Sequence, residues 1–181
     1  MAASSPSLTP TSYVVLGLLA SLGPSTPYDM EQYVDASLGH FWSFPHSQLY
    51  SEPARLTAHG LVEEHREEGG RRRRTFTLTG AGRQALQDWL AAPQGDAASA
   101  APAPEIRDLG LLKLFFGAVA RDEADVVANA RLQAQAHRAK LQLYEDLAQL
   151  AQEPHVAATL RLGTAYERAA IAFWDSIAQP A

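Results

Sequence analysis

Apolar and polar positions along the first half of the chain predict a series of short helices followed by a strand pair. Residues 13–21 are apolar on nearly every side, which predicts a buried helix, and Gly23 ends it. Thr26 and Asp29 have the spacing of a helix cap, so a second helix should extend from there to about Leu38. This part of the chain therefore starts with two packed helices.

A third helix is predicted over residues 45–59. Leu49 and Leu56 lie two turns apart, so both should face the core. The other side of this helix is polar. It is either a binding face or a face turned to solvent, and the pattern alone does not separate the two. The polar residues that share this face are Ser47, Ser51 and Arg55.

Pro53 falls inside this third helix. A proline in a regular helix removes one backbone hydrogen bond and costs about 3 kcal/mol. We therefore expect the helix either to kink near Leu49 and Tyr50 or to start afresh after Pro53. Both alternatives would change the direction of its N-terminal end.

Residues 61–66 and 75–78 have strand character, and a charged turn over residues 67–74 joins them into a hairpin. Thr79 then caps a further helix with an apolar stripe. Ion pairing across the hairpin would keep such an edge ribbon soluble and competes with any role for its arginines in binding. The charged residues involved are Glu63, Glu64, Glu67 and Glu68, and Arg71, Arg72, Arg73 and Arg74.

Residues 93–104 are rich in Pro and Ala and predict a linker, after which the pattern is helical throughout. A long helix should run from about Asp122 to Gln152, and Pro154 should start the last one. The long helix has an apolar repeat at alternating spacings of three and four, which is typical of a seam between paired helices. The seam consists of Val127, Ala130, Ala134, His137, Leu141, Tyr144, Ala148 and Ala151.

Composition excludes several classes of protein. The chain of 181 residues has no cysteine, so disulfides, thiolate catalysis and cysteine-bound metals are excluded. Its six histidines show no metal-binding spacing, so we predict no metal site. No cluster of acid, base and nucleophile occurs, and we predict that the protein is not an enzyme and has no cofactor. No signal peptide or apolar run long enough to span a membrane is evident, and we expect a soluble, cytoplasmic protein.

Charge is unevenly placed. The net charge is −5, and residues 1–92 hold seven arginines and nine acidic residues, so a general basic face is absent. Four of those arginines are consecutive, at positions 71–74. Any attraction for a polyanion must therefore be local, and tight non-specific DNA binding is not expected.

A helix followed at once by a hairpin with an arginine-rich tip is the layout of a winged helix-turn-helix domain. The residues closely resemble the PadR-like transcriptional regulators over nearly the whole chain, including residues 161–174 near the C-terminus. The motifs that carry the resemblance are Ser47-Gln48-Leu49-Tyr50, Ala54-Arg55-Leu56, Gly60-Leu61-Val62 and Leu78-Thr79-Gly80-Ala81-Gly82-Arg83.

The resemblance implies a mainly α protein with two domains. We predict a disordered N-terminus over residues 1–10, a winged helix-turn-helix domain with a two-stranded wing over 11–92, the linker over 93–104 and an all-helical dimerisation domain over 105–181. The function it implies is that of a homodimer that binds double-stranded DNA at an inverted-repeat operator and represses transcription. The alternative is a winged-helix module that contacts only other proteins.

The third helix and the hairpin tip supply the predicted contacts with DNA. Gln48 can pair with adenine, and Arg55 can reach guanine or a phosphate. The predicted DNA-binding residues are His46, Ser47, Gln48, Tyr50, Ser51, Arg55, Arg71, Arg72, Arg73 and Arg74.

Members of this family respond to small molecules, which makes a small-molecule effector a candidate partner, but the sequence establishes neither its existence nor its identity. Aromatic residues near the expected domain junction are the candidates for its pocket: Trp42, Phe44 and Trp174. Large apolar residues of the C-terminal half are the candidates for the dimer interface: Leu112, Phe115, Phe116, Leu141, Tyr144, Phe173 and Trp174.

Overall fold

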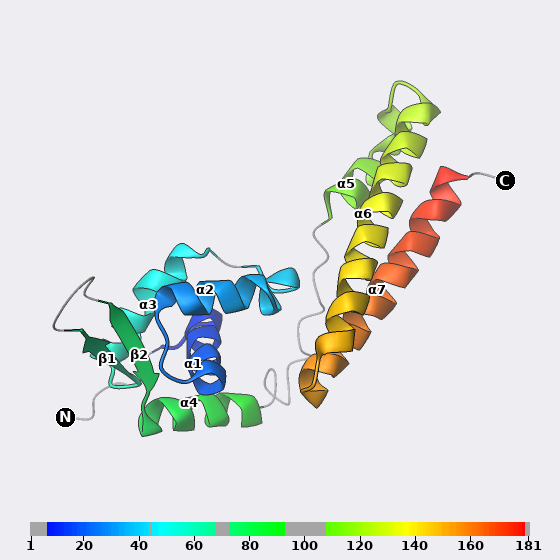
Figure 1. Cartoon of the computed structure of the whole chain (residues 1–181). Helices are drawn as coiled ribbons and strands as arrows, with labels where there is room; N and C mark the ends of the chain where they lie inside the picture. Colours follow the sequence, from blue (N-terminus) through cyan, green and yellow to red (C-terminus); the bar gives the residue numbers. More distant parts are fainter. Residues whose placement is uncertain (1–6, 44, 68–72, 93–107, 180–181) are drawn as a thin grey trace. The chain divides into compact units, whose positions relative to one another are not determined.

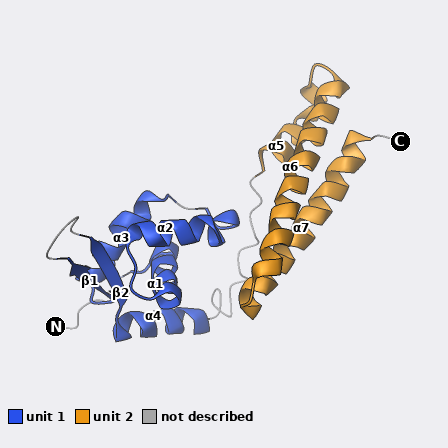
Figure 2. Cartoon of the chain, viewed as in Figure 1, with its two compact units in different colours: residues 1–102 blue, residues 103–181 orange. Residues whose placement is uncertain are grey.

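The computed structural model describes residues 7–43, 45–67, 73–92 and 108–179. The chain divides into two compact units, Met1–Pro102 and Ala103–Ala181 (Figure 2). The predicted linker, residues 93–104, lies outside the described residues.

Among the described residues, unit 1 holds four α-helices, a short 3₁₀ turn and a pair of strands (Figure 1). Its core combines the apolar face of α1 with Met30, Val34, Leu49, Leu56 and the buried ring of Phe76. The elements are α1 (Pro10–Leu22), α2 (Pro27–Asp35), the short 3₁₀ turn η1 (Leu38–His40), α3 (Ser47–Ala58), β1 (Val62–Arg66), β2 (Arg74–Leu78) and α4 (Gly80–Ala91).

The start of α1 requires a correction to the predicted N-terminus. Thr9 and Pro10, which we assigned to a disordered segment, begin the helix. The Thr9 side chain accepts from the Ser12 main-chain N–H, and the Ser12 side chain accepts from the Thr9 N–H. This reciprocal cap satisfies backbone donors that a helix end otherwise leaves unpaired, so α1 starts three residues earlier than its apolar pattern.

The two strands are antiparallel and pair Val62 with Leu78 at one end and Arg66 with Arg74 at the other. Phe76 at the centre also pairs with Ser25, and each residue donates its N–H to the other's carbonyl, at 3.0 and 2.9 Å. The hairpin is therefore anchored to the segment between α1 and α2. Because Phe76 is fully buried, its ring adds apolar contacts to this backbone pairing.

The elements described in unit 2 are all helices: α5 (Leu109–Phe115), η2 (Gly117–Val119), α6 (Glu123–Leu150) and α7 (Pro154–Ala178). The long helices α6 and α7 lie side by side (Figure 1). Trp174 of α7 is buried against Ala130 and Ala134 of α6, whose small side chains leave room for the indole. At the other end of the pair, the ring of Tyr144 lies over Gly163, where a Cβ would come within 2.8 Å of it.

Part of the seam predicted along the long helix is thus occupied within the chain itself. His137 Nδ1 lies 2.5 Å from Glu167 Oε2, and both side chains are largely buried. α7 covers the seam at Ala130, Ala134, His137 and Tyr144, whereas Leu141 is half-buried and Ala148 is exposed. The repeat correctly indicated a paired helix but not which helix is the partner.

Candidate nucleic-acid interface

Helix α3 packs against the rest of unit 1 through one buried ridge, formed by Leu49, Pro53 and Leu56. These positions lie four and three residues apart and therefore share one face of the helix. On the opposite face, Ser47 and Ser51 are exposed. Small side chains there allow the helix backbone to approach another surface closely.

Pro53 lies inside a continuous helix. α3 runs from Ser47 to Ala58 without a break, so the expectation that a new helix starts after Pro53 is wrong. The proline is fully buried, and its ring fills part of the core beneath the helix. The hydroxyl of Thr57 donates to the Pro53 carbonyl at 2.9 Å.

One flank of α3 is tied to α1. The Thr11 hydroxyl donates to Gln48 Oε1 at 2.7 Å. Arg55 donates to both oxygens of Glu52, at 2.9 and 2.6 Å, and to the Ser12 hydroxyl at 2.8 Å. Two of the predicted DNA-binding side chains therefore hold the third helix in place on the first.

The other flank of α3 is tied to α2. The Tyr50 hydroxyl donates to Glu31 Oε2 at 2.6 Å, and His46 Nδ1 lies 3.1 Å from Glu31 Oε1. His46 Nε2 also lies 3.7 Å from Asp35. The hydrogen bond from Tyr50, and then that from His46, lowers the pKa of the Glu31 carboxyl, while the same bond to Glu31 raises the pKa of Tyr50.

Sequence reasoning did not identify these supporting residues, which are Thr11, Ser12, Glu31 and Asp35. They lie between eleven and forty-three positions from their partners in α3 and belong to separate helices. Helical periodicity reports neighbours three or four residues apart and carries no signal for such contacts. Only the packing of α1 and α2 around α3 brings them together.

Within the wing, which is the hairpin of β1 and β2 with its turn, Glu64 joins two arginines. Arg74 donates to its two oxygens at 2.8 and 2.9 Å, and Arg66 Nε lies 2.5 Å from Oε1. The guanidinium of Arg74 also lies 5.3 Å from the ring centre of Phe76. The bonds from Arg74 and then Arg66 lower the pKa of Glu64 to about 2.

Ion pairing within the wing, which the sequence left as an alternative, is therefore present at Arg66 and Arg74. Arg73 is exposed at the end of the described part of the hairpin. The predicted contacts at Arg71 and Arg72 lie outside the described residues.

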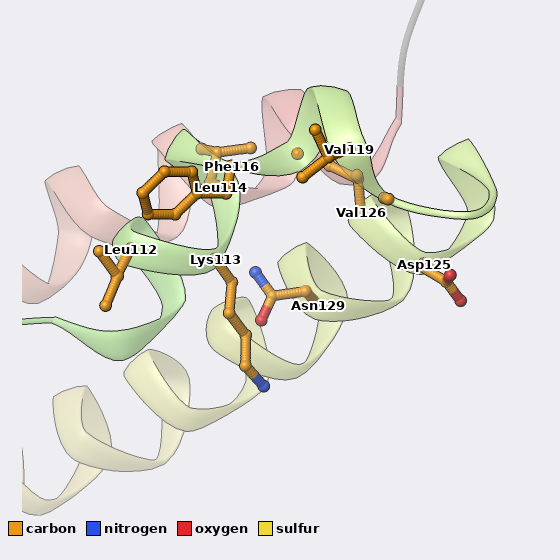
Figure 3. Close-up of a pocket in the computed structure, with 10 residues that line it drawn as sticks. Leu112, Lys113, Leu114, Phe116, Val119, Asp125, Val126 and Asn129 are labelled. Carbon is orange, nitrogen blue, oxygen red and sulfur yellow. The ribbon is translucent and has the colours of Figure 1, made fainter.

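The candidate effector residues have different surroundings. Trp42 is about half exposed, whereas Trp174 is 2% exposed and packs in the core of unit 2. Phe44 lies outside the described residues. A separate cavity of about 530 Å³ lies in unit 2, between α5, η2 and the start of α6 (Figure 3). Its lining is mostly apolar, with Lys113, Asp125 and Asn129 as the polar members.

The predicted dimer residues also divide into two groups. Leu141 is half-buried, and Tyr144 and Trp174 are buried within unit 2 itself. The others are exposed, with Phe115 reaching 81%, as are two apolar residues of α7 that we did not predict, Leu162 and Tyr166. The exposed predicted residues are Leu112, Phe115, Phe116 and Phe173.

Two further features are absent from the described residues. No helix among them has both the length and the apolar character needed to cross a membrane. No group of three or more His, Asp or Glu side chains among them is arranged to hold a metal ion.

Comparison with protein families gives two matches. Residues 15–88 match the Transcriptional regulator PadR-like family, and residues 106–179 match the family Virulence activator alpha C-term. Among curated proteins, the Negative transcriptional regulator PadR of Bacillus subtilis (strain 168) is 36% identical over 125 residues. That alignment covers 67% of this chain and 64% of the relative, so the chain spans less than two thirds of the relative's length.

Solved structures resemble the chain over a greater length. The crystal structure of Bacillus subtilis PadR in complex with operator DNA aligns with a TM-score of 0.75 and 26% identity, covering 92% of this chain and 96% of that chain. The same protein in complex with p-coumaric acid aligns with a TM-score of 0.72 and 26% identity, covering 92% and 95%. Together with the motifs of α3 and the wing, these similarities show that the chain belongs to the PadR-like family of transcriptional regulators.

Proposed function

We propose that this protein is a homodimeric DNA-binding transcriptional regulator that represses from an inverted-repeat operator. The observation that carries the function is the pairing, in one unit, of an exposed polar ridge on α3 with the adjacent two-stranded wing. In winged helices the first enters the major groove and the second contacts the backbone. The Bacillus subtilis relative of the same fold was crystallised with operator DNA, which supports this assignment.

The role of each polar side chain on α3, in contacting DNA or in holding the helix in place, would depend on its position. Ser47 and Ser51 lie on the exposed ridge and would allow close approach to the base edges. Gln48 has its amide oxygen bonded to Thr11, so it would offer its amide nitrogen to a base acceptor. Arg55 would act mainly by holding α3 to α1, because Glu52 and Ser12 already bind its guanidinium. His46 and Tyr50 lie at the N-terminal end of the helix and are also assigned to contacts with DNA.

Within the wing, we assign the phosphate contact to Arg73. Its side chain is exposed, whereas Arg74 binds both oxygens of Glu64 and lies over Phe76. A paired guanidinium is less available to a phosphate. Arg71 and Arg72 remain predicted phosphate contacts from the sequence.

A second copy of the chain is the proposed partner of the exposed apolar side chains of unit 2. On α7, Leu162, Tyr166 and Phe173 recur at spacings of four and seven, so they follow one face of the helix, and all three are exposed. On α5, Leu112 and Phe115 are exposed as well. Large exposed apolar side chains that follow one helix face are typical of a surface that associates with another chain.

A small-molecule effector is a further part of the proposal. The Bacillus subtilis relative was crystallised with p-coumaric acid, which supports ligand binding in this chain also. Among the described residues, the cavity between α5 and α6 combines an apolar lining with the ammonium of Lys113, the carboxylate of Asp125 and the amide of Asn129 (Figure 3). These features suit an apolar ligand that carries one polar or anionic group.

A gel shift with the DNA upstream of the protein's own gene tests the function. The full-length protein should retard this DNA in the presence of excess random-sequence DNA and should protect two half-sites related by inverted repeat. A protein that retards neither DNA, or both equally at every salt concentration, would instead favour the protein-contact module.

A further inference from the structure

The hydroxyl of Tyr50 has its hydrogen-bond direction fixed by Glu31. A hydroxyl has one hydrogen to donate, and an ionised carboxylate can only accept. Because Tyr50 Oη lies 2.6 Å from Glu31 Oε2, the hydrogen of Tyr50 must point towards Glu31. The Tyr50 oxygen then presents only its lone pairs to any other group.

The orientation of the Glu31 carboxylate is also fixed. Its second oxygen lies 3.1 Å from His46 Nδ1, so each oxygen has its own partner on α3. The lowered pKa of Glu31 keeps the carboxylate ionised, and the raised pKa of Tyr50 keeps the hydroxyl protonated. The hydroxyl of Tyr50 therefore donates in this hydrogen bond, and the carboxylate of Glu31 accepts.

Phosphate oxygens and base amino groups make opposite demands on this tyrosine. Phosphate oxygens accept hydrogen bonds, so they have nothing to offer an oxygen that can only accept. In the major groove, the hydrogen-bond donors are the N6 amino group of adenine and the N4 amino group of cytosine. Tyr50 is about half exposed and lies in the N-terminal half of α3, the part of a recognition helix that contacts base edges.

We propose that Tyr50 reads an adenine or cytosine amino group as a hydrogen-bond acceptor, and that Glu31 is the positioning residue that fixes this direction. Glu31 lies on α2 and acts through Tyr50. In this arrangement Tyr50 contributes to sequence preference and not to general affinity for DNA, since the backbone carries no donor. The assignment rests on the proposed function, because it requires α3 to enter the major groove.

The test uses the full-length protein and the duplex that it selects from a random-sequence library. At each adenine or cytosine of the half-site, the base is replaced by an analogue that lacks the exocyclic amino group. We expect one position at which the wild type loses about 3- to 10-fold in affinity, the range of one hydrogen bond. Tyr50→Phe should lose the same factor on the unmodified operator, show no further loss with that analogue and keep its affinity for random DNA. Tyr33→Phe, another partly exposed tyrosine, is the matched control and should match the wild type throughout.

The role of Glu31 has its own readout. In Glu31→Gln the side chain can donate as well as accept, which frees the Tyr50 hydrogen for a phosphate. The analogue effect should shrink and affinity for random DNA should rise, whereas a purely structural Glu31 would lower both affinities on replacement. The assignment is overturned, while the proposed function stands, if Tyr50→Phe weakens binding to operator and random DNA equally. The same holds if every base analogue lowers the affinity of Tyr50→Phe as much as it lowers that of the wild type. If the wild type selects no duplex, the proposed function itself fails.

Discussion

Gly82 of α4 lies directly against the main-chain carbonyl of Leu61. A Cβ at position 82 would come within 2.0 Å of that oxygen and 2.8 Å of the Leu78 side chain. The same carbonyl accepts from the Thr79 N–H at 3.2 Å, and the Thr79 hydroxyl donates to the Gly60 carbonyl at 2.8 Å. The start of α4 is thus fastened to the turn between α3 and β1, and this contact requires glycine.

We therefore predict that Gly82→Ala destabilises unit 1. The added methyl group cannot fit without a backbone shift, and we expect a loss of about 1–3 kcal/mol in the free energy of unfolding. Gly80→Ala is the control, because a Cβ there meets nothing within 4 Å. It should be neutral or stabilise by about 0.4–1 kcal/mol. Chemical denaturation of both variants decides this, and an equally stable Gly82→Ala would contradict the packing described.

Pro53→Leu should stabilise the protein. Leucine restores an N–H that can bond the Leu49 carbonyl, and a proline inside a helix costs about 3 kcal/mol, so a gain of about 1–3 kcal/mol is expected. Pro53→Ala restores the same donor without filling the buried site, so the difference between the two variants reports the packing of the side chain. A loss of stability in both would mean that the helix backbone at this point requires proline.

Glu64 predicts a pH dependence of stability. Its pKa of about 2 in the folded protein lies below the ordinary value of 4.5, so its ionised form is favoured by folding. This contribution is fully present above about pH 4.5 and is lost as the pH falls towards 2. Urea denaturation across this range should show a shallower pH dependence in Glu64→Gln. Arg74→Gln should have a similar effect, because Arg74 is the main cause of the shift; a variant with the slope of the wild type would refute the pairing.

Arg73 and Arg74 should behave differently towards DNA. Arg73→Ala is expected to weaken operator and random DNA by similar factors and to reduce the salt slope by about 0.9, the value for one phosphate contact. Arg74→Ala should change the slope less, since Glu64 already binds its guanidinium. Fluorescence anisotropy over a range of salt concentrations separates the two variants. A salt slope in Arg73→Ala equal to that of the wild type would remove Arg73 from its assigned role.

Dimerisation should depend on the exposed apolar residues of unit 2. Phe115→Asp and Leu162→Asp place a charge on side chains that are 81% and 73% exposed, so neither should disturb the fold of the unit. Each should shift the protein towards the monomer and lower operator affinity by at least about 100-fold through lost bivalency. Gln135→Asp, at an exposed polar position of α6, is the control. Sedimentation gives the answer, and a Leu162→Asp variant that remains a dimer would exclude this face of α7.

The amino-acid pattern was sufficient for the order of elements. The spacing of Leu49 and Leu56 predicted the helix α3. The caps at Thr26 and Thr79 predicted the starts of α2 and α4, and both helices begin there in the structure. These features are local, since a cap is set by residues about three positions apart and a helix face by residues within about two turns of each other. The capping pair of Thr9 and Ser12 is equally local, although we overlooked it because the segment around it is rich in Ser and Pro.

The sequence by itself thus determined a winged helix followed by long helices, and the motifs of α3 indicated the family. Only the tertiary structure decided what each side chain touches: that α7 covers the seam of α6, that Arg55 turns to Ser12, and that Glu31 holds Tyr50. The physical reason is that a repeat of apolar or polar positions fixes which face a residue occupies but not what lies opposite that face. Partners from distant parts of the chain are chosen by the fit of whole helices, as when Ala130 and Ala134 leave space for Trp174.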